Sequence, residues 1–183
     1  MVKHMKLAFG QQLGAIFQIA YVVDDIRAAI HEHARRLHIG PWQLLEHFTP
    51  QWQKYRGKPT ELDASIAISF SGSMMFELIQ QHNDVPSVFR DVVNRRGYGL
   101  HHLAVSTRDF EGDCARYRGM GYEPIFEAAA EGGLRVAYFD TLATLPAMLE
   151  IMDMPVSIES RWASLQSECA KWDGRDAILE SRA

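Results

Sequence analysis

The pattern of hydrophobic and polar positions along this chain occurs twice. The first copy has an apolar strand pattern, Gln18-Ile-Ala-Tyr-Val-Val, that leads to Asp25, and the second has His102-Leu-Ala-Val-Ser-Thr, which leads to Asp109. After each Asp the apolar or half-apolar positions step by four, three and four residues, which is the spacing of one helix face. Each Asp can accept the free amide hydrogens of the first helical turn. Both copies therefore predict a strand that runs into a capped helix.

Each copy then continues with two further β-rich segments. They are residues 65–70 and 74–79 in the first copy, and residues 134–139 and 147–152 in the second. The last strand of each copy carries one carboxylate within an apolar run, Glu77 in the first and Glu150 in the second. We therefore predict an α+β fold of two tandem β-α-β-β-β modules, about 15–80 and about 99–153.

Three segments lie outside the repeat. An insertion at residues 41–63 is predicted to form a strand and a long loop near the site, and the linker at 81–98 a helix from Ser87 to about Arg96. A C-terminal helix at about 156–173 carries an apolar stripe that predicts core packing or a subunit contact. That stripe consists of Ile158, Trp162, Leu165, Cys169 and Trp172. We expect residues 1–183 to form one domain.

The composition narrows the class of protein. The chain has 47% hydrophobic and 23% charged residues, which is typical of a globular protein, and no apolar run approaches the roughly 20 residues of a membrane span. A net charge of -4 with dispersed Lys and Arg argues against nucleic acid as a partner. The start lacks the apolar stretch of a secretory signal, and Cys114 and Cys169 have neither metal-type nor redox-type spacing. These features predict a cytoplasmic location.

The two strand glutamates are the strongest indication of chemistry. A carboxylate within an apolar strand must be hydrogen-bonded, paired, neutralised or bound to a metal, because leaving it buried and unpaired costs several kcal/mol. Glu77 and Glu150 occupy equivalent repeat positions, and so do Gln18 and His102. The four side chains converge if the modules are related by a pseudo-twofold axis. As an alternative, the glutamates could form buried ion pairs with arginines such as Arg95 or Arg135.

Four segments carry a resemblance to a known family. They are Phe17-Gln18-Ile-Ala-Tyr, Phe76-Glu77-Leu-Ile, Gly99-Leu-His-His102-Leu-Ala-Val and Leu149-Glu150-Ile-Met. Over residues 15 to 153 the chain resembles the vicinal oxygen chelate superfamily, which includes glyoxalase I, methylmalonyl-CoA epimerase, extradiol dioxygenases and bleomycin-resistance proteins. The resemblance implies a cupped mixed sheet around one divalent metal, with Gln18, Glu77, His102 and Glu150 as ligands. This ligand set does not choose among Zn, Ni, Co, Mn and Fe.

The resemblance also implies a mechanism. The metal would polarise a substrate carbonyl and stabilise an enediolate, while Glu150, a ligand, would also move the proton on the adjacent carbon. Epimerases of the family are expected to carry a second acid/base glutamate ahead of the strand that begins near Ile66, and here Asp63 takes that place with a side chain one methylene shorter. Extradiol dioxygenases typically use two His and one Glu, so Gln18 disfavours that chemistry.

Two hypotheses for function follow from the sequence. The first is a metal-dependent lyase or isomerase, a homodimer, that acts on a small thioester, hemithioacetal or oxo-acid. The second is a metal-free binding protein of the bleomycin-resistance type, which the insertion aromatics Trp42, Trp52 and Tyr55 favour mildly. In both, strand alternation predicts that His101 faces away from His102, toward a helix or solvent.

Overall fold

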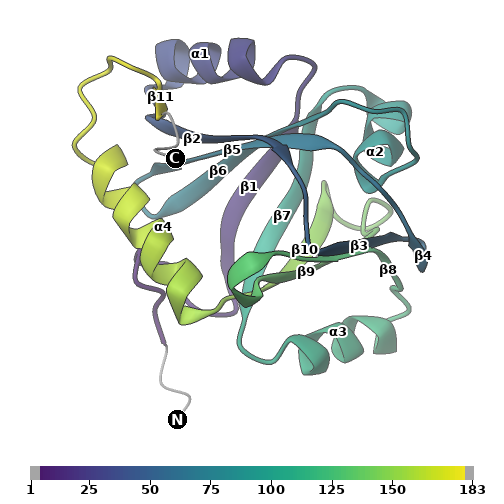
Figure 1. Cartoon of the computed structure of the whole chain (residues 1–183). Helices are drawn as coiled ribbons and strands as arrows, with labels where there is room; N and C mark the ends of the chain where they lie inside the picture. Colours follow the sequence, from purple (N-terminus) through teal and green to yellow (C-terminus); the bar gives the residue numbers. More distant parts are fainter. Residues whose placement is uncertain (1–4, 180–183) are drawn as a thin grey trace.

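In the computed structural model, residues 5–179 are described, and the strands of this part form a single eleven-stranded sheet (Figure 1). The first four and last four residues, which we included in the predicted domain, lie outside the described residues. The strand order is β11-β2-β5-β6-β1-β7-β10-β9-β8-β3-β4. Helices α1 to α4 accompany this curved mixed sheet, which confirms the predicted α+β class.

The two halves of the sheet repeat the same unit. The first half contains β1 (Ile16–Val22), α1 (Ile26–Leu37), β2 (Trp42–Phe48), β5 (Ala64–Ser71) and β6 (Met74–Gln81). The second contains β7 (Gly99–Thr107), α3 (Phe110–Gly119), β8 (Pro124–Ala129), β9 (Arg135–Phe139) and β10 (Met148–Asp153). In each half the first strand pairs in parallel with the last, and β1 and β7 meet antiparallel at the centre. The repeated sequence pattern therefore becomes a repeated sheet.

Helix boundaries follow the predicted caps at their N-termini. The Asp25 carboxylate accepts a hydrogen bond from Ala28 N at 2.9 Å, and Ser87 caps α2 (Val88–Arg96) in the same way. At the end of α1 the left-handed residue is His38, with φ of 54°, rather than a glycine. Two residues later, Gly40 leaves no room for a side chain, because a Cβ there would lie 2.8 Å from the ring of Trp172.

The insertion joins the two halves. After β2 the chain crosses through residues 49–51 to a short hairpin of β3 (Trp52–Tyr55) and β4 (Lys58–Pro59). Strand β3 pairs antiparallel with β8, which belongs to the other half of the sheet (Figure 1). The Tyr55 hydroxyl donates to Asp91 on α2 at 2.9 Å and holds this hairpin against the linker. Only part of the insertion is therefore the predicted loop, and its β3–β4 hairpin extends the sheet beyond β8.

The C-terminal helix α4 (Val156–Cys169) packs on the first half, against β5 (Figure 1). Trp162 is stacked on Phe17 with ring centroids 6.0 Å apart, and Leu165 lies in the same core cluster. The predicted stripe is therefore core packing for these residues. The helix ends earlier than expected, and the chain then adds β11 (Ile178–Leu179) beside β2. None of the helices described is long and apolar enough to cross a bilayer.

Candidate active site

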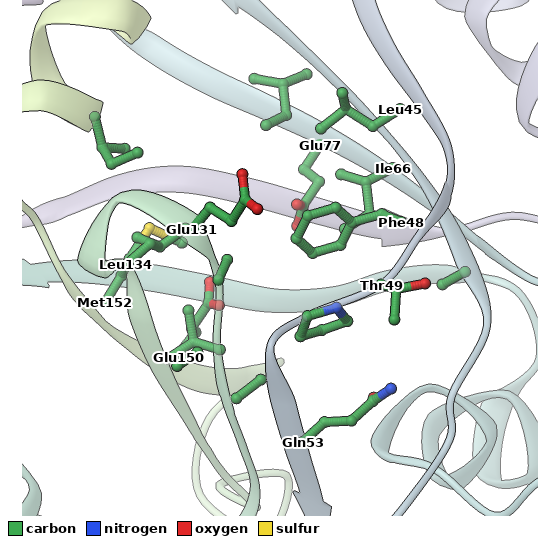
Figure 2. Close-up of a pocket in the computed structure, with 18 of the residues that line it drawn as sticks. Leu45, Phe48, Thr49, Gln53, Ile66, Glu77, Glu131, Leu134, Glu150 and Met152 are labelled. Carbon is green, nitrogen blue, oxygen red and sulfur yellow. The ribbon is translucent and has the colours of Figure 1, made fainter.

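A cavity of about 570 Å³ lies between the two halves of the sheet. This volume falls in the range of small-molecule sites, about 300–1,000 Å³. Its wall is mostly apolar and comes from both halves, from residues 48–51 of the insertion and from α4. Figure 2 shows Leu45, Phe48, Ile66, Leu134 and Met152 around the carboxylates of Glu77 and Glu150.

The four predicted ligands meet at this cavity. Gln18, Glu77 and Glu150 belong to its wall, and His102 lies next to them without any solvent exposure. The Nε2 atom of His102 is 3.1 Å from Glu150 Oε2, 3.4 Å from Glu77 Oε2 and 3.4 Å from Gln18 Oε1. Residues that are far apart in the sequence thus present one nitrogen and three oxygens to a common point.

Strand register explains this convergence. In the parallel pairs, Ala20 lies opposite Glu77 and Ala104 lies opposite Glu150, so the two halves place their glutamates in equivalent positions. The central pair β1–β7 has two register shifts, one that leaves Phe17 unpaired and one that leaves His101 unpaired. A bulge of this kind re-aims the side chains beside it. Each bulge immediately precedes a predicted ligand, Gln18 or His102.

Burial changes the proton affinity of Glu77, His102 and Glu150. The pKa of Glu150 rises from its ordinary value of 4.5 to about 8 because the carboxylate is removed from water, although a hydrogen bond from Tyr138 opposes the rise. The pKa of Glu77 rises well above its ordinary value through burial and through repulsion by Glu150. Burial lowers the pKa of His102 to about 3. The imidazole is therefore neutral at pH 7, and the carboxylates resist ionisation unless a cation is present.

The donor set fits a divalent cation. Glu77 Oε2 and Glu150 Oε2 are buried and have no hydrogen-bond partner in the described structure, which is costly for carboxylate oxygens. Ligand atoms around one ion with bonds of about 2.1 Å lie roughly 3.0 to 3.4 Å apart, close to the separations around His102. In the described residues, no three or more His, Cys, Asp or Glu side chains form a ready-made metal cage by themselves. Any metal here would thus draw on Gln18 and on oxygens from outside the protein.

Asp63 is not brought to the cavity. Its neighbours Leu62 and Ala64 line the wall, but the Asp63 carboxylate lies 2.9 Å from Nδ1 of His47. A catalytic role for Asp63 therefore gains nothing from the geometry.

Three other expectations also differ from the structure. Arg95 pairs with Asp140, and Arg135 pairs with Asp153 and Glu111, so neither arginine neutralises a strand glutamate. Of the insertion aromatics, Trp42, Trp52 and Tyr55 are not part of the cavity wall either. Trp42 is buried against α1, Trp52 is 45% exposed, and Tyr55 is bonded to Asp91.

Sequence reasoning missed three residues of the site. Tyr138 packs edge-on to His102 with ring centroids 4.9 Å apart and lines the cavity. Glu131, in the glycine-rich turn between β8 and β9, lines it as well, and so does Arg161 of α4. Both are exposed, and neither forms an ion pair with another residue between 5 and 179. The run Glu131-Gly132-Gly133 was the one available signal, since glycines often permit a backbone turn beside a ligand.

Comparisons with known proteins agree with this arrangement. A family model described as "Glyoxalase/Bleomycin resistance protein/Dioxygenase superfamily" matches residues 17–138. A search of curated proteins found no significant match.

Solved structures share the fold at low sequence identity. A hypothetical protein from Bacillus halodurans C-125 is 18% identical with a TM-score of 0.55, and the match covers 76% of this chain and 94% of that one. Methylmalonyl-CoA epimerase from Mycobacterium tuberculosis is 16% identical with a TM-score of 0.53, over 85% of this chain and 93% of that one. A variant of the Streptomyces coelicolor epimerase in complex with 2-nitronate-propionyl-CoA is 16% identical with a TM-score of 0.52, over 77% and 94%. Likeness at this level establishes a common fold and leaves substrate open.

Proposed function

Because the chain belongs to the glyoxalase/bleomycin resistance protein/dioxygenase superfamily, we propose that it is a divalent-metal-dependent lyase or isomerase that moves a proton next to a substrate carbonyl. One observation carries the proposal. Within the described residues, one oxygen of each of two buried carboxylates has no hydrogen-bond partner at the point where Gln18 and His102 also converge, beside a cavity of ligand size. This arrangement is costly for a structural core and suits a cation site.

A bound metal would supply Lewis-acid polarisation of the substrate carbonyl. Gln18, Glu77 and His102 would hold it, and Glu150 would have two tasks, as ligand and as proton carrier. A carboxylate bound to a cation is a weaker base, so the proton-carrier role of Glu150 would require a weak bond to the metal. Tyr138, in the same wall and edge-on to His102, lowers the proton affinity of Glu150. The apolar wall excludes water from the reacting carbon.

The substrate class follows from the wall of the cavity. Its apolar lining accommodates a small carbon skeleton, and Arg161 offers a cation to a carboxylate or another anionic group. We propose a small thioester, hemithioacetal or oxo-acid. The structural likeness to methylmalonyl-CoA epimerases supports a thioester as the first class to test.

The first test is elemental analysis of protein purified without a histidine tag, before and after reconstitution with divalent metals. We expect about one metal per chain in the wild type and loss of metal in Glu77→Ala and His102→Ala. Glu150→Gln should keep part of the metal and lose turnover of methylmalonyl-CoA epimers or glyoxalase-type hemithioacetals. No metal in the reconstituted wild type would refute metal dependence, and unchanged turnover in Glu150→Gln would remove that residue from the proton-carrier role.

A metal-free binding protein is the second candidate function. The mostly apolar wall favours it, and Trp162 in that wall would report occupancy through its fluorescence. A ligand that quenches this fluorescence equally with and without a chelator would favour binding over catalysis. The homodimer also stays a prediction, which light scattering after size-exclusion chromatography would test.

A further inference from the structure

We propose that His101 is a positioning residue that fixes the tautomer of His102, so that the unprotonated Nε2 of His102 faces Glu77 and Glu150. The consequence for metal binding rests on the proposed function. The tautomer itself does not, because it is a property of the metal-free protein.

His101 occupies the bulge of β7. The register passes from Ala20 opposite His102 to Tyr21 opposite Leu100, so His101 is the extra residue of its strand. The bulge breaks the alternation that would turn neighbouring side chains to opposite faces. The two imidazoles consequently meet, with their Nδ1 atoms 2.9 Å apart. We had expected His101 to face away from His102, and it contacts both His102 and helix α2.

The hydrogen atoms in the series of hydrogen bonds from Val88 through His101 to His102 can be assigned from the Val88 end. His101 Nε2 lies 3.1 Å from the carbonyl oxygen of Val88, and a carbonyl can only accept, so this nitrogen carries a hydrogen. A neutral imidazole has one N–H, so His101 Nδ1 is an acceptor. His102 Nδ1, 2.9 Å away, must then donate. In a neutral His102 this leaves Nε2 with a lone pair and no hydrogen.

Both rings are held neutral by their surroundings. His101 and His102 have no solvent exposure. The ring of His101 packs against the rings of Phe89 and Tyr138, with centroid-to-centroid distances of 5.0 Å and 6.0 Å. No carboxylate pairs with His101 in the described structure. Burial and the neighbouring His102 lower the pKa of His101 well below its ordinary value, in agreement with this assignment.

The choice of tautomer decides what the site can bind. If His102 Nε2 carried a hydrogen, it could donate to Glu150 Oε2 at 3.1 Å, and the cluster would be a satisfied buried hydrogen-bond network. With Nε2 unprotonated, a nitrogen lone pair faces the oxygens of Glu77 and Glu150, and only a proton on a carboxyl group or a cation can lie between them. His101 thereby keeps the nitrogen lone pair available to a cation. Partners behind a metal-binding histidine commonly set ligand orientation in this way.

The test uses nitrogen NMR of protein labelled with ¹⁵N-histidine, in chelator at neutral pH. We expect His102 to carry its hydrogen on Nδ1 in the wild type. His101→Gln keeps an acceptor for that hydrogen and should preserve the tautomer. His101→Phe fills the space without an acceptor and should shift His102 toward protonation at Nε2. His31→Gln, an exposed histidine on α1, is the control for assignment and folding.

Zinc and nickel affinities, measured by competition with a chromogenic chelator, give the second measurement. We expect His101→Phe to bind about 10- to 100-fold more weakly than wild type, and His101→Gln to stay within about threefold. A hydrogen on His102 Nε2 in the wild type would overturn the proposal, and so would an unchanged tautomer in His101→Phe. If His101→Phe does not fold, the wild type and His101→Gln still decide. Absence of metal binding in a wild type with the expected tautomer would instead refute the proposed function alone.

Discussion

Above a pH of about 6.5 the stability of the metal-free protein should fall as the pH rises, and Glu150 should be a main cause. Below that value the lowered pKa values of His101 and His102 act in the opposite direction, because the unfolded histidines bind protons that the folded ones do not. In the unfolded chain the Glu150 carboxyl loses its proton near the ordinary pKa of 4.5, whereas in the folded protein it keeps the proton up to about 8. Between these values the folded state binds more protons than the unfolded state, so rising pH favours unfolding. The raised pKa of Glu77 acts in the same direction.

The magnitude follows from the same values. The interval from 4.5 to about 8 corresponds, at about 1.4 kcal/mol per pH unit, to a loss of up to about 5 kcal/mol. That is a large part of the stability of a typical domain, about 5–15 kcal/mol. Glu150→Gln cannot ionise and should lose the part of this dependence that Glu150 contributes, while the part from Glu77 remains. A bound divalent cation should remove both parts, because the cation stabilises the ionised carboxylates of the folded state.

Urea unfolding followed by circular dichroism between pH 6.5 and pH 8 would measure this effect, which for Glu150 amounts to about 2 kcal/mol over that interval. Wild type, Glu150→Gln and the exposed-site control Glu168→Gln should be compared in chelator and again with excess zinc. We expect the wild type and the control to lose stability together, and the Glu150 variant to change less. Equal slopes for all three proteins in chelator would refute the assigned burial and protonation of Glu150.

Three shorter predictions concern the cavity and its surroundings. Glu131→Gln should lower kcat by about tenfold or more and Asp63→Asn should leave it within about twofold, because the Glu131 side chain lines the cavity whereas the Asp63 carboxylate pairs with His47. The opposite order in steady-state kinetics would restore Asp63 as an acid/base candidate. Arg161→Gln should raise KM for an anionic substrate by about tenfold, equal to about 1.4 kcal/mol, and leave KM for its neutral ester unchanged. Gly40→Ala should destabilise the protein by about 1–3 kcal/mol in urea unfolding, because its methyl group would overlap the Trp172 ring. An unaltered midpoint would contradict that contact.

The fold was largely predictable because its signals are local and repeated. The strand patterns that begin at Gln18 and His102 and the caps at Asp25 and Asp109 are each written in a few neighbouring residues. Strand β3 was not predictable as part of the sheet. Its pairing with β8 joins residues more than seventy positions apart, and nothing in the residues of either strand specifies the other.

The four residues that converge at the site were predictable from the sequence, whereas the residues that surround them were less so. Glu77 and Glu150 are conspicuous because carboxylates are rare in apolar strands. The position of His101 depends on a register shift between β1 and β7, which single-sequence alternation cannot reveal. Asp63 was aligned by its distance from the following strand, whereas its side-chain direction depends on a partner, His47, from another strand. Glu131 lies in a turn without periodicity, so no pattern singled it out.

The crossing of residues 49–51 has a consequence for how the chain could be divided. Strand β3 belongs to the first half in sequence but pairs with β8 of the second half, so the sheet of the second half is complete only when the first half supplies this strand. If the chain were cut in the linker and the two fragments were expressed together, the N-terminal fragment would carry β3 and the C-terminal fragment would carry β8, the strand with which β3 pairs. We expect them to reassemble by strand complementation, and a ligand that fills the shared cavity to strengthen the reassembly. The same topology that closes the cavity would make this protein a split sensor for its own substrate.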